Sequence, residues 1–437
     1  MFFMEQRKGD TRAAIALCNC LAVAQSATQP PLVLLQGARE YFPELIAAIG
    51  TARTTVYIES YLIHDDPSTH EVLGALIAAR SRGVGVYLLL DGFGASEDVD
   101  WVRAMLSPYD IAVELYRPGL RWLAPNTWRR LHRKLVMIDE RVGFVGGINL
   151  IGDHVDPVRG ALPGPRLDFA VRVASSRPLA TMSRVMRRLW WRVSLRNAFR
   201  GSIGRLLTQD RRQAELVVLR EAWRRTRRHL RWRGPPVRRH ASRRARLLLR
   251  DNFRHRRDIE RWYLSSIEFA EREILIANAY FVPTFRFRQA LIRAAARGVR
   301  VRLLIQSSSD QWWTHWATQA LIGELVTSGV EVYEYTESFL HAKVAVIDDA
   351  ITVGSSNIDP FSLMFSLEAN LMAEDPAVAG DLRGRIERAI REASRRLQPT
   401  TEHRSPLRAL ARQISLTFAL MALRAFIGFS GTAFRIR

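Results

Sequence analysis

The order of apolar and polar positions predicts the same succession of elements in each half of the chain. Apolar and β-branched residues predict buried strands at 55–61 and 84–91, and helical spacing predicts a helix between them that ends near Gly83. The second half repeats this order with a strand, a helix and a strand at residues 274–280, 287–297 and 299–305. The pattern therefore indicates a duplicated strand–helix–strand unit.

This alternation indicates an α/β fold in which helices cover a sheet. The duplication is clearest where "AARSRGVGVYLLL" matches "AAARGVRVRLLI", each with a glycine that ends a helix. A chain of 437 residues is longer than one core usually accommodates, so we expect two fused, duplicated lobes. The expected division is an N-terminal segment 1–30, a first lobe 31–205, an Arg-rich linker 206–243, a second lobe 244–400 and a C-terminal segment 401–437.

One motif occurs in both halves. The segments "LHRKLVMIDERVGFVGGINL" and "LHAKVAVIDDAITVGSSNID" each contain His-x-Lys-x-x-x-x-Asp, followed by small residues and an Asn. The chain has only three lysines, and two of them lie in these segments, so a chance match is improbable. The candidate site residues are His132, Lys134, Asp139 and Asn149 with His341, Lys343, Asp348 and Asn357.

The alternation of side chains along a strand predicts which of these residues face the same way. His and Lys two positions apart share one face of a strand, whereas Asp139, seven positions after His132, should lie away from that face. The two aspartates complete the catalytic motif, but this spacing suggests that they are structural anchors. Two such hairpins facing each other would gather two His, two Lys and two Asn around one site.

That set of side chains suits a phosphodiester substrate. One imidazole can attack phosphorus and form a phosphohistidine, while the other protonates the leaving oxygen and later deprotonates the incoming hydroxyl. Lys134, Lys343, Asn149 and Asn357 would bind the non-bridging oxygens. This chemistry requires no metal or other cofactor, and we expect neither.

A reacting histidine needs a partner that fixes its tautomer. A carboxylate follows each motif in a strand-like segment: Asp168 in "RLDFAVRV" and Glu368 in "SLEANLMA". We expect each to support the histidine of its own half, Asp168 with His132 and Glu368 with His341. An ordinary carboxylate at a strand edge is the alternative for both.

Charge narrows the choice of partners. The chain has 65 Lys and Arg against 43 Asp and Glu, a formal net charge of +22, which implies nucleic acid or an acidic membrane surface as partner. The linker 206–243 is either solvated or in contact with an anionic surface. The segment from about Leu407 is typical of an amphipathic interfacial helix or of one docked on the protein. No run reaches the roughly 18–20 apolar residues of a membrane span.

At the two motifs the chain resembles the phospholipase D superfamily. "HRKLVMIDERVGFVGGIN", "IANAYFVP" and "VGSSNIDPFSLMFSLEAN" are similar to its bacterial cardiolipin synthase branch, particularly the B type. The resemblance implies two fused α/β/α sandwich lobes with the active site at their interface. It further implies phosphatidyl transfer from an anionic or zwitterionic phospholipid to glycerol or phosphatidylglycerol, at the cytoplasmic face of the cell membrane, with His132 as the nucleophile.

Two departures from the doubled motif stand out. The spacing from Asp348 to Gly354 is one residue shorter than that from Asp139 to Gly146, which could shift the second turn. Gly147 stands where the second motif has Ser355, so a hydroxyl contact there would be one-sided.

Three other functions remain open from the sequence alone. Hydrolysis of phospholipid differs from transfer only in using water as the acceptor. A nuclease would use the same chemistry and suit the positive charge, although the apolar–basic C-terminal segment favours lipid over nucleic acid. A non-catalytic binding protein is disfavoured because both motifs are intact.

Overall fold

The computed structural model describes residues 30–118, 129–206, 245–251, 255–306, 322–359 and 366–398. Three predicted segments lie outside these ranges except at their ends: the N-terminal segment 1–30, the Arg-rich linker 206–243 and the C-terminal segment 401–437. The predictions for these segments are therefore not addressed by the structure.

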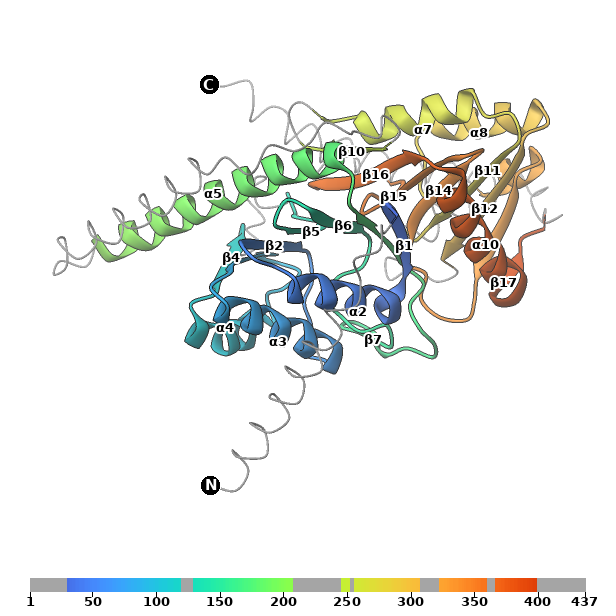
Figure 1. Cartoon of the computed structure of the whole chain (residues 1–437). Coiled ribbons are helices and arrows are strands. Elements are labelled where there is room, and N and C mark those ends of the chain that lie inside the picture. Colours follow the sequence, from blue (N-terminus) through green and yellow to red (C-terminus); the bar gives the residue numbers. More distant parts are fainter. Residues whose placement is uncertain are drawn as a thin grey trace.

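Two mixed sheets form the centre of the molecule (Figure 1). Within the described residues, the first has seven strands in the order β1-β9-β6-β5-β2-β3-β4. These strands are β1 (Leu32–Gln36), β2 (Thr55–Ser60), β3 (Gly85–Asp91), β4 (Ala112–Tyr116), β5 (Lys134–Ile138), β6 (Val142–Gly146) and β9 (Phe169–Val173).

The second sheet has eight described strands in the order β10-β16-β15-β14-β11-β12-β13-β17. They are β10 (Ala245–Arg250), β11 (Glu273–Asn278), β12 (Arg300–Gln306), β13 (Glu331–Tyr335), β14 (Lys343–Ile347), β15 (Ala350–Gly354), β16 (Glu368–Glu374) and β17 (Ser394–Arg396). A small hairpin of β7 (Val155–Asp156) and β8 (Gly160–Ala161) stands apart from both sheets.

The two sheets repeat one topology, as the duplicated sequence pattern predicts. β2, β3 and β4 run parallel, and so do β11, β12 and β13, while the motif strands β5 and β14 join these triplets antiparallel. The predicted helix ends are also confirmed, because Gly83 and Gly298 follow their helices with φ of +88° and +89°. β17 extends the second sheet with an additional edge strand.

Helices cover the outer face of each sheet (Figure 1). Those of the first lobe are α2 (Gly37–Gly50), α3 (Pro67–Ser81) and α4 (Val99–Leu106), followed by the short 3₁₀ helix η1 (Ser107–Tyr109). Those of the second lobe are α7 (Asp258–Glu268), α8 (Phe285–Ala296) and the helical residues 322–327. Each set forms its own hydrophobic core with its sheet.

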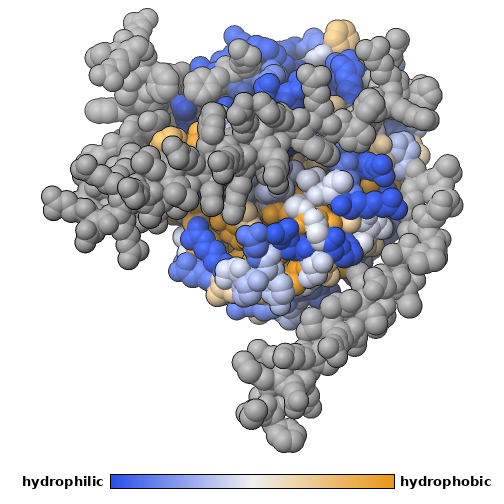
Figure 2. Space-filling view, turned by 60° about the vertical axis from the view of Figure 1, so that its left-hand side comes forward, coloured by the Kyte–Doolittle hydropathy of each residue, from blue (hydrophilic) through white to orange (hydrophobic). Residues whose placement is uncertain are grey.

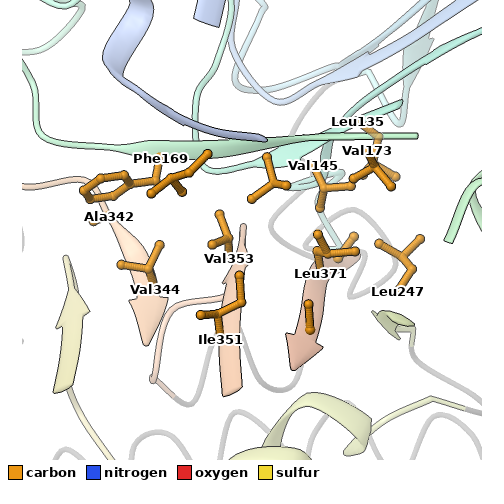
Figure 3. Close-up of a cluster of buried hydrophobic side chains, with 14 of the residues drawn as sticks. Leu135, Val145, Phe169, Val173, Leu247, Ala342, Val344, Ile351, Val353 and Leu371 are labelled. Carbon is orange, nitrogen blue, oxygen red and sulfur yellow. The ribbon is translucent and has the colours of Figure 1, made fainter. Parts of the chain in front are cut away.

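The inner faces of the two sheets pack against each other (Figure 3). Leu135, Val145 and Phe169 of the first sheet lie opposite second-sheet residues in one buried cluster. The opposing residues include Val344, Val353 and Leu371. The motif strands thus have both faces buried, which explains why "KLVMI" and "KVAVI" are almost continuously apolar.

Two further helices complete this central layer. α5 (Ser176–Leu206) follows β9 and contacts β10 of the other lobe, while α10 (Pro376–Ala393) follows β16 and contacts β1. Both contribute buried residues to the cluster between the sheets, such as Met182 and Leu382. Each of these helices therefore packs against both lobes, and the α/β/α arrangement is confirmed with the lobes joined through one core.

The described surface is mainly hydrophilic but includes some hydrophobic residues. Figure 2 shows mostly hydrophilic residues on the described surface of one face, with hydrophobic residues visible between them in a central area. Several large apolar side chains are exposed, among them Phe93, Val158 and Phe285.

The one-residue difference between the motifs is absorbed in their turns. The first hairpin turns through residues 139–141, with Asp139 and Glu140 at φ of +50° and +57°, whereas the second turns through Asp348 and Asp349. Leu135 pairs with Val145 and Val344 pairs with Val353, so the strand register next to the site is the same in both lobes.

Candidate active site

Each motif lysine begins a central strand, and its histidine precedes that strand. Lys134 is the first residue of β5 and Lys343 the first of β14, and both side chains are at least 96% buried. The Lys134 Nζ donates to the backbone carbonyl of His132 at 2.8 Å, and Lys343 Nζ makes the same contact with His341. Each lysine therefore turns back towards its own histidine at the site end of the strand.

Backbone hydrogen bonds tie each histidine to the other lobe. The His132 amide donates to Leu367 O at 3.1 Å, and the Leu367 amide donates to Arg130 O at 2.8 Å. Symmetrically, the His341 amide donates to Leu167 O at 2.9 Å, and the Leu167 amide donates to Phe339 O at 3.0 Å. Leu367 and Leu167 come directly before the two candidate carboxylates, Glu368 and Asp168.

Because of these contacts, the carboxylate of each lobe lies beside the histidine of the other lobe. His132 Nδ1 lies 3.2 Å from Glu368 Oε2, and His341 Nδ1 lies 2.6 Å from Asp168 Oδ2. The expectation that Asp168 supports His132 and Glu368 supports His341 is therefore wrong. The physical reason is that the segment leading into β9 or β16 pairs with the motif of the opposite lobe, not with its own.

The surroundings of Nδ1 determine the tautomer of both histidines. Nδ1 of His132 faces Glu368 and also Ser355 O at 3.2 Å, and both are acceptors. Nδ1 must therefore carry a proton, which leaves Nε2 of each neutral imidazole to react. The side chains of His132 and His341 are 18% and 15% exposed, so substrate can reach them, whereas both carboxylates are fully buried.

Burial shifts the ionisation of the whole cluster. It lowers the pKa of His132 and, together with the charge of Lys343, lowers that of His341 well below its usual value. Burial also raises the pKa of Asp168 to about 6 and lowers those of Lys134 and Lys343 to about 7 and about 8. Since an anion would relieve the cost of two buried cations, the site is electrostatically suited to a phosphate group.

The small residues after each motif play different parts. The Ser355 hydroxyl donates to Glu368 Oε2 at 2.5 Å, whereas a Cβ on Gly147 would lie 2.2 Å from Asp168 Oδ1. The hydroxyl contact is one-sided, as the sequence indicated. The serine orients the longer carboxylate, and the glycine leaves room for the shorter one.

The two asparagines are placed near the ends of the motif hairpins. Asn149 Oδ1 accepts from the Leu62 amide at 3.3 Å, which leaves its Nδ2 for another partner. Asn357 is 6% exposed, and its Oδ1 has no hydrogen-bond partner within the described residues. Their binding to phosphate oxygens stays a prediction.

The motif aspartates anchor the hairpins at the opposite ends of β5 and β14. Asp139 accepts from the amides of Arg53, Thr54 and Thr55 at 2.7 to 2.8 Å. Asp348 accepts from the amides of Glu271, Arg272 and Glu273 at 2.9 to 3.0 Å. This geometry agrees with the anchor interpretation, since neither carboxylate contacts a motif histidine or lysine in the described structure.

Sequence reasoning missed a pair of residues that hold the segments before the histidines. Asp91 ends β3 and accepts from the Leu131 amide at 2.7 Å, and Gln306 ends β12 and accepts from the Leu340 amide at 2.5 Å. The signal was a polar residue ending an apolar strand at the same place in both repeats.

A buried ion pair in the first lobe was missed as well. Arg133, between the motif His and Lys, donates to both oxygens of Glu59 at 2.9 and 3.0 Å. Both residues are at least 94% buried, and burial raises the pKa of Glu59 against the attraction of Arg133. The equivalent positions of the second lobe are Ala277 and Ala342.

The described residues contain neither a candidate metal cluster nor a candidate membrane span. They contain no group of three or more His, Cys, Asp or Glu side chains placed to hold a metal ion. Among the helices that the structure describes, none combines the length and apolar character needed to cross a membrane.

Known proteins are similar to this chain in sequence or in fold. A family model described as cardiolipin synthase, phospholipase D-like domain, matches residues 45–159 and 263–390. Cardiolipin synthase B of Shigella flexneri and that of Escherichia coli K12 are each 36% identical over 351 residues, which cover 78% of this chain and 76% of the relative. The crystal structure of a phosphatidylserine synthase from Haemophilus influenzae Rd KW20 superposes with a TM-score of 0.56 at 12% identity, covering 90% of this chain and 93% of that one. With its doubled motif, its repeated sheets and these matches, the chain belongs to the cardiolipin synthase family of phospholipase D-like proteins.

Proposed function

We propose that this protein is a cardiolipin synthase, a phosphatidyltransferase that moves a phosphatidyl group from a phospholipid to a glycerol-type hydroxyl through a phosphohistidine. The observation that carries the proposal is the pair of largely buried imidazoles, each with Nδ1 on a buried carboxylate of the other lobe, beside two buried lysines. The relatives named cardiolipin synthase support the choice of substrate.

In the first half-reaction, Nε2 of His132 attacks phosphorus as the bond to the headgroup oxygen breaks. The bound anionic phosphodiester favours the imidazolium form of His341, which donates its Nε2 proton to that leaving oxygen, so the headgroup departs as an alcohol. Lys134 and Lys343 compensate the charge on the non-bridging oxygens, with Asn149 and Asn357 as further donors. The assignment of His132 as nucleophile follows the family resemblance.

In the second half-reaction, an acceptor alcohol takes the place of the departed headgroup. His341 removes the proton from its hydroxyl, the oxygen attacks phosphorus, and the phosphorus–nitrogen bond to His132 breaks. Glycerol as acceptor gives phosphatidylglycerol, and phosphatidylglycerol as acceptor gives cardiolipin. Glu368 and Asp168 stabilise the imidazolium that forms on each histidine in turn.

A lipid substrate requires contact with a bilayer. We place the protein peripherally at the cytoplasmic face of the cell membrane, because its net charge of +22 favours an anionic surface. We expect no nucleic-acid partner.

Lipid product analysis tests the proposal directly. The purified protein is incubated with labelled phosphatidylglycerol or phosphatidylethanolamine vesicles and glycerol, without added metal, beside His132→Ala and His341→Ala. We expect cardiolipin or phosphatidylglycerol from the native protein and neither from the variants. Phosphatidic acid alone would make the protein a hydrolase, and cleavage of a labelled oligonucleotide with no lipid product would make it a nuclease.

The order of the histidines has a separate test. A phosphatidyl ester of nitrophenol needs no proton on its leaving group, so the first half-reaction should survive in His341→Ala and leave a labelled phosphohistidine on His132. Label trapped on His341 in the His132→Ala variant would reverse the two assignments.

A further inference from the structure

The segment between β6 and β9 reaches from the first lobe onto the second. It contains the β7–β8 hairpin, and it is longer than the segment between β15 and β16. Gly164 O accepts from the Ser338 hydroxyl at 2.6 Å, and the Leu167 amide donates to Phe339 O. The residues that follow the hairpin are therefore held against the segment that leads into His341.

Two arginines of this segment surround an aromatic ring beside His341. The Phe339 ring centroid lies 6.0 Å from that of His341. The Arg159 and Arg166 guanidinium carbons lie 4.7 Å and 5.9 Å from the Phe339 centroid. Two positive charges therefore stand close to the histidine that serves as acid and base.

Hydrogen bonds hold the side chain of Arg166 and the backbone of Arg159. Arg166 Nη2 donates to Val155 O at 2.6 Å and to Asp156 Oδ2 at 3.3 Å, and its side chain is buried. The Arg159 amide donates to Asp156 Oδ1 at 3.1 Å within the hairpin turn, while its side chain is partly exposed. Arg166 thus fixes the hairpin, and Arg159 is the arginine that a ligand can reach.

The His341 side of the site receives the second alcohol. By microscopic reversibility, the group that protonates the leaving headgroup also deprotonates the acceptor, so both alcohols occupy the same place. Glycerol and water bring no further charge to that place. Phosphatidylglycerol brings a second phosphodiester, separated from its reacting hydroxyl by the three carbons of glycerol.

We propose that Arg159, stacked on Phe339 and supported by Arg166, binds the phosphodiester of a glycerophospholipid acceptor and so selects that acceptor over glycerol and water. This inference rests on the proposed function. Arginine suits the task because its planar donors match phosphate oxygens and its face stacks on an aromatic ring. The charge of Arg166 already reaches the site, since it contributes to lowering the pKa of His341, after burial and the two motif lysines.

Three reactions of the full-length protein on vesicles test the subsite. The first is the control, either exchange of labelled glycerol into phosphatidylglycerol or hydrolysis of phosphatidylglycerol to phosphatidic acid, and it involves no second phosphate in either half-reaction. Cardiolipin synthesis has the second phosphate on the acceptor. The reverse reaction, cardiolipin with glycerol, has it on the leaving group.

Arg159→Gln should lower cardiolipin synthesis and the reverse reaction about tenfold each and leave exchange or hydrolysis within about twofold. Arg159→Lys should restore only part of the loss, because it keeps the charge but loses the planar donors and the face that stacks on Phe339. Arg141→Gln, which removes an exposed arginine at the far end of the first motif hairpin, should change none of the three reactions.

The outcomes separate the two proposals. An equal loss in all three reactions, or no loss in any, would overturn the acceptor subsite while leaving the transferase intact. If the native protein forms neither cardiolipin nor exchanged phosphatidylglycerol, the proposed function itself fails.

Discussion

The two histidines occupy equivalent places in the two lobes, but different side chains surround them. His132 has a glutamate that is oriented by Ser355, and a buried Arg133–Glu59 pair lies beside it. His341 has an aspartate that fits against Gly147, and alanines replace the ion pair. The duplicated backbone preserved the positions of the reacting groups, while their supports diverged.

The lobes share some supports of the site and differ in others. The lobes share the His–Lys pairs, the anchoring aspartates and a polar strand-end residue that holds the segment before each histidine. They differ in carboxylate length, in the serine and in the ion pair. The shared parts set the geometry, and the divergent parts give the two imidazoles different surroundings.

The largest effect is expected from the ion pair that only the first lobe has. Arg133→Ala leaves the Glu59 carboxylate buried without its partner and should reduce the free energy of unfolding by about 3–5 kcal/mol. The double variant Glu59→Ala with Arg133→Ala imitates the second lobe and should be more stable than Arg133→Ala alone. Denaturant unfolding of the double-mutant cycle measures both, and additive losses would contradict a coupled pair.

The crossed carboxylates give the next effect. Glu368→Gln and Asp168→Asn should each lower kcat about 10- to 100-fold, because each removes the charge that stabilises an imidazolium. With the nitrophenyl ester, Glu368→Gln should behave like a His132 variant and Asp168→Asn like a His341 variant. The opposite assignment would indicate pairing within each lobe and contradict the crossed geometry.

A smaller effect is expected from the aspartates that both motifs share. Asp139→Ala and Asp348→Ala each remove three backbone hydrogen bonds and should cost about 1–3 kcal/mol of stability, with kcat within a few-fold at low temperature. Burial opposes ionisation of Asp139, but hydrogen bonds from Thr54, Thr55 and Arg53 prevail and lower its pKa. Its stabilisation should thus be lost in acid, as the pH falls through that lowered pKa. A large fall in kcat without a change in stability would make these residues catalytic.

The smallest and most graded effect is expected from pH. With pKa values of about 7 and about 8, Lys134 and Lys343 lose their protons as pH rises through that range, and kcat/KM should fall. The free energy of unfolding should rise with pH over the same range. The reason is that the lysines of the unfolded chain stay protonated up to their usual pKa, whereas those of the folded protein do not. Unfolding of native protein and Lys134→Met between pH 7 and 9 measures this, and the variant should show a weaker rise. An equal rise in both would remove Lys134 as its source.

Much of the fold could be predicted because the periodic pattern reports local structure. The strands at 55–61 and 84–91 and the helix ending near Gly83 depend on neighbouring residues, and the structure confirms them within a few residues. The His-x-Lys spacing was equally local. The turns also behaved locally, since one inserted residue changed the first turn without shifting the register of β5.

The rest of the site depends on contacts between the lobes, which no local pattern encodes. Asp168 and Glu368 were recognised as partners from their place after each motif, but order along the chain suggested the wrong histidine for each. Arg133 and Glu59 meet across neighbouring strands far apart in sequence, so their pairing needed the sheet order. The role of Asp91 could not be recognised from the sequence, because a polar residue at the end of an apolar strand is common.

The contact of each carboxylate with the histidine of the opposite lobe has a consequence for the symmetry of the chain. Residue His132 of one lobe meets Glu368 of the other, and His341 meets Asp168 in return, which is the reciprocal contact of two copies related by a twofold axis. A single lobe on its own would hold a histidine without its carboxylate, and two identical lobes would complete each other. The chain therefore has approximately the symmetry of a homodimer within one polypeptide, and a substitution in one lobe leaves the equivalent position of the other lobe unchanged.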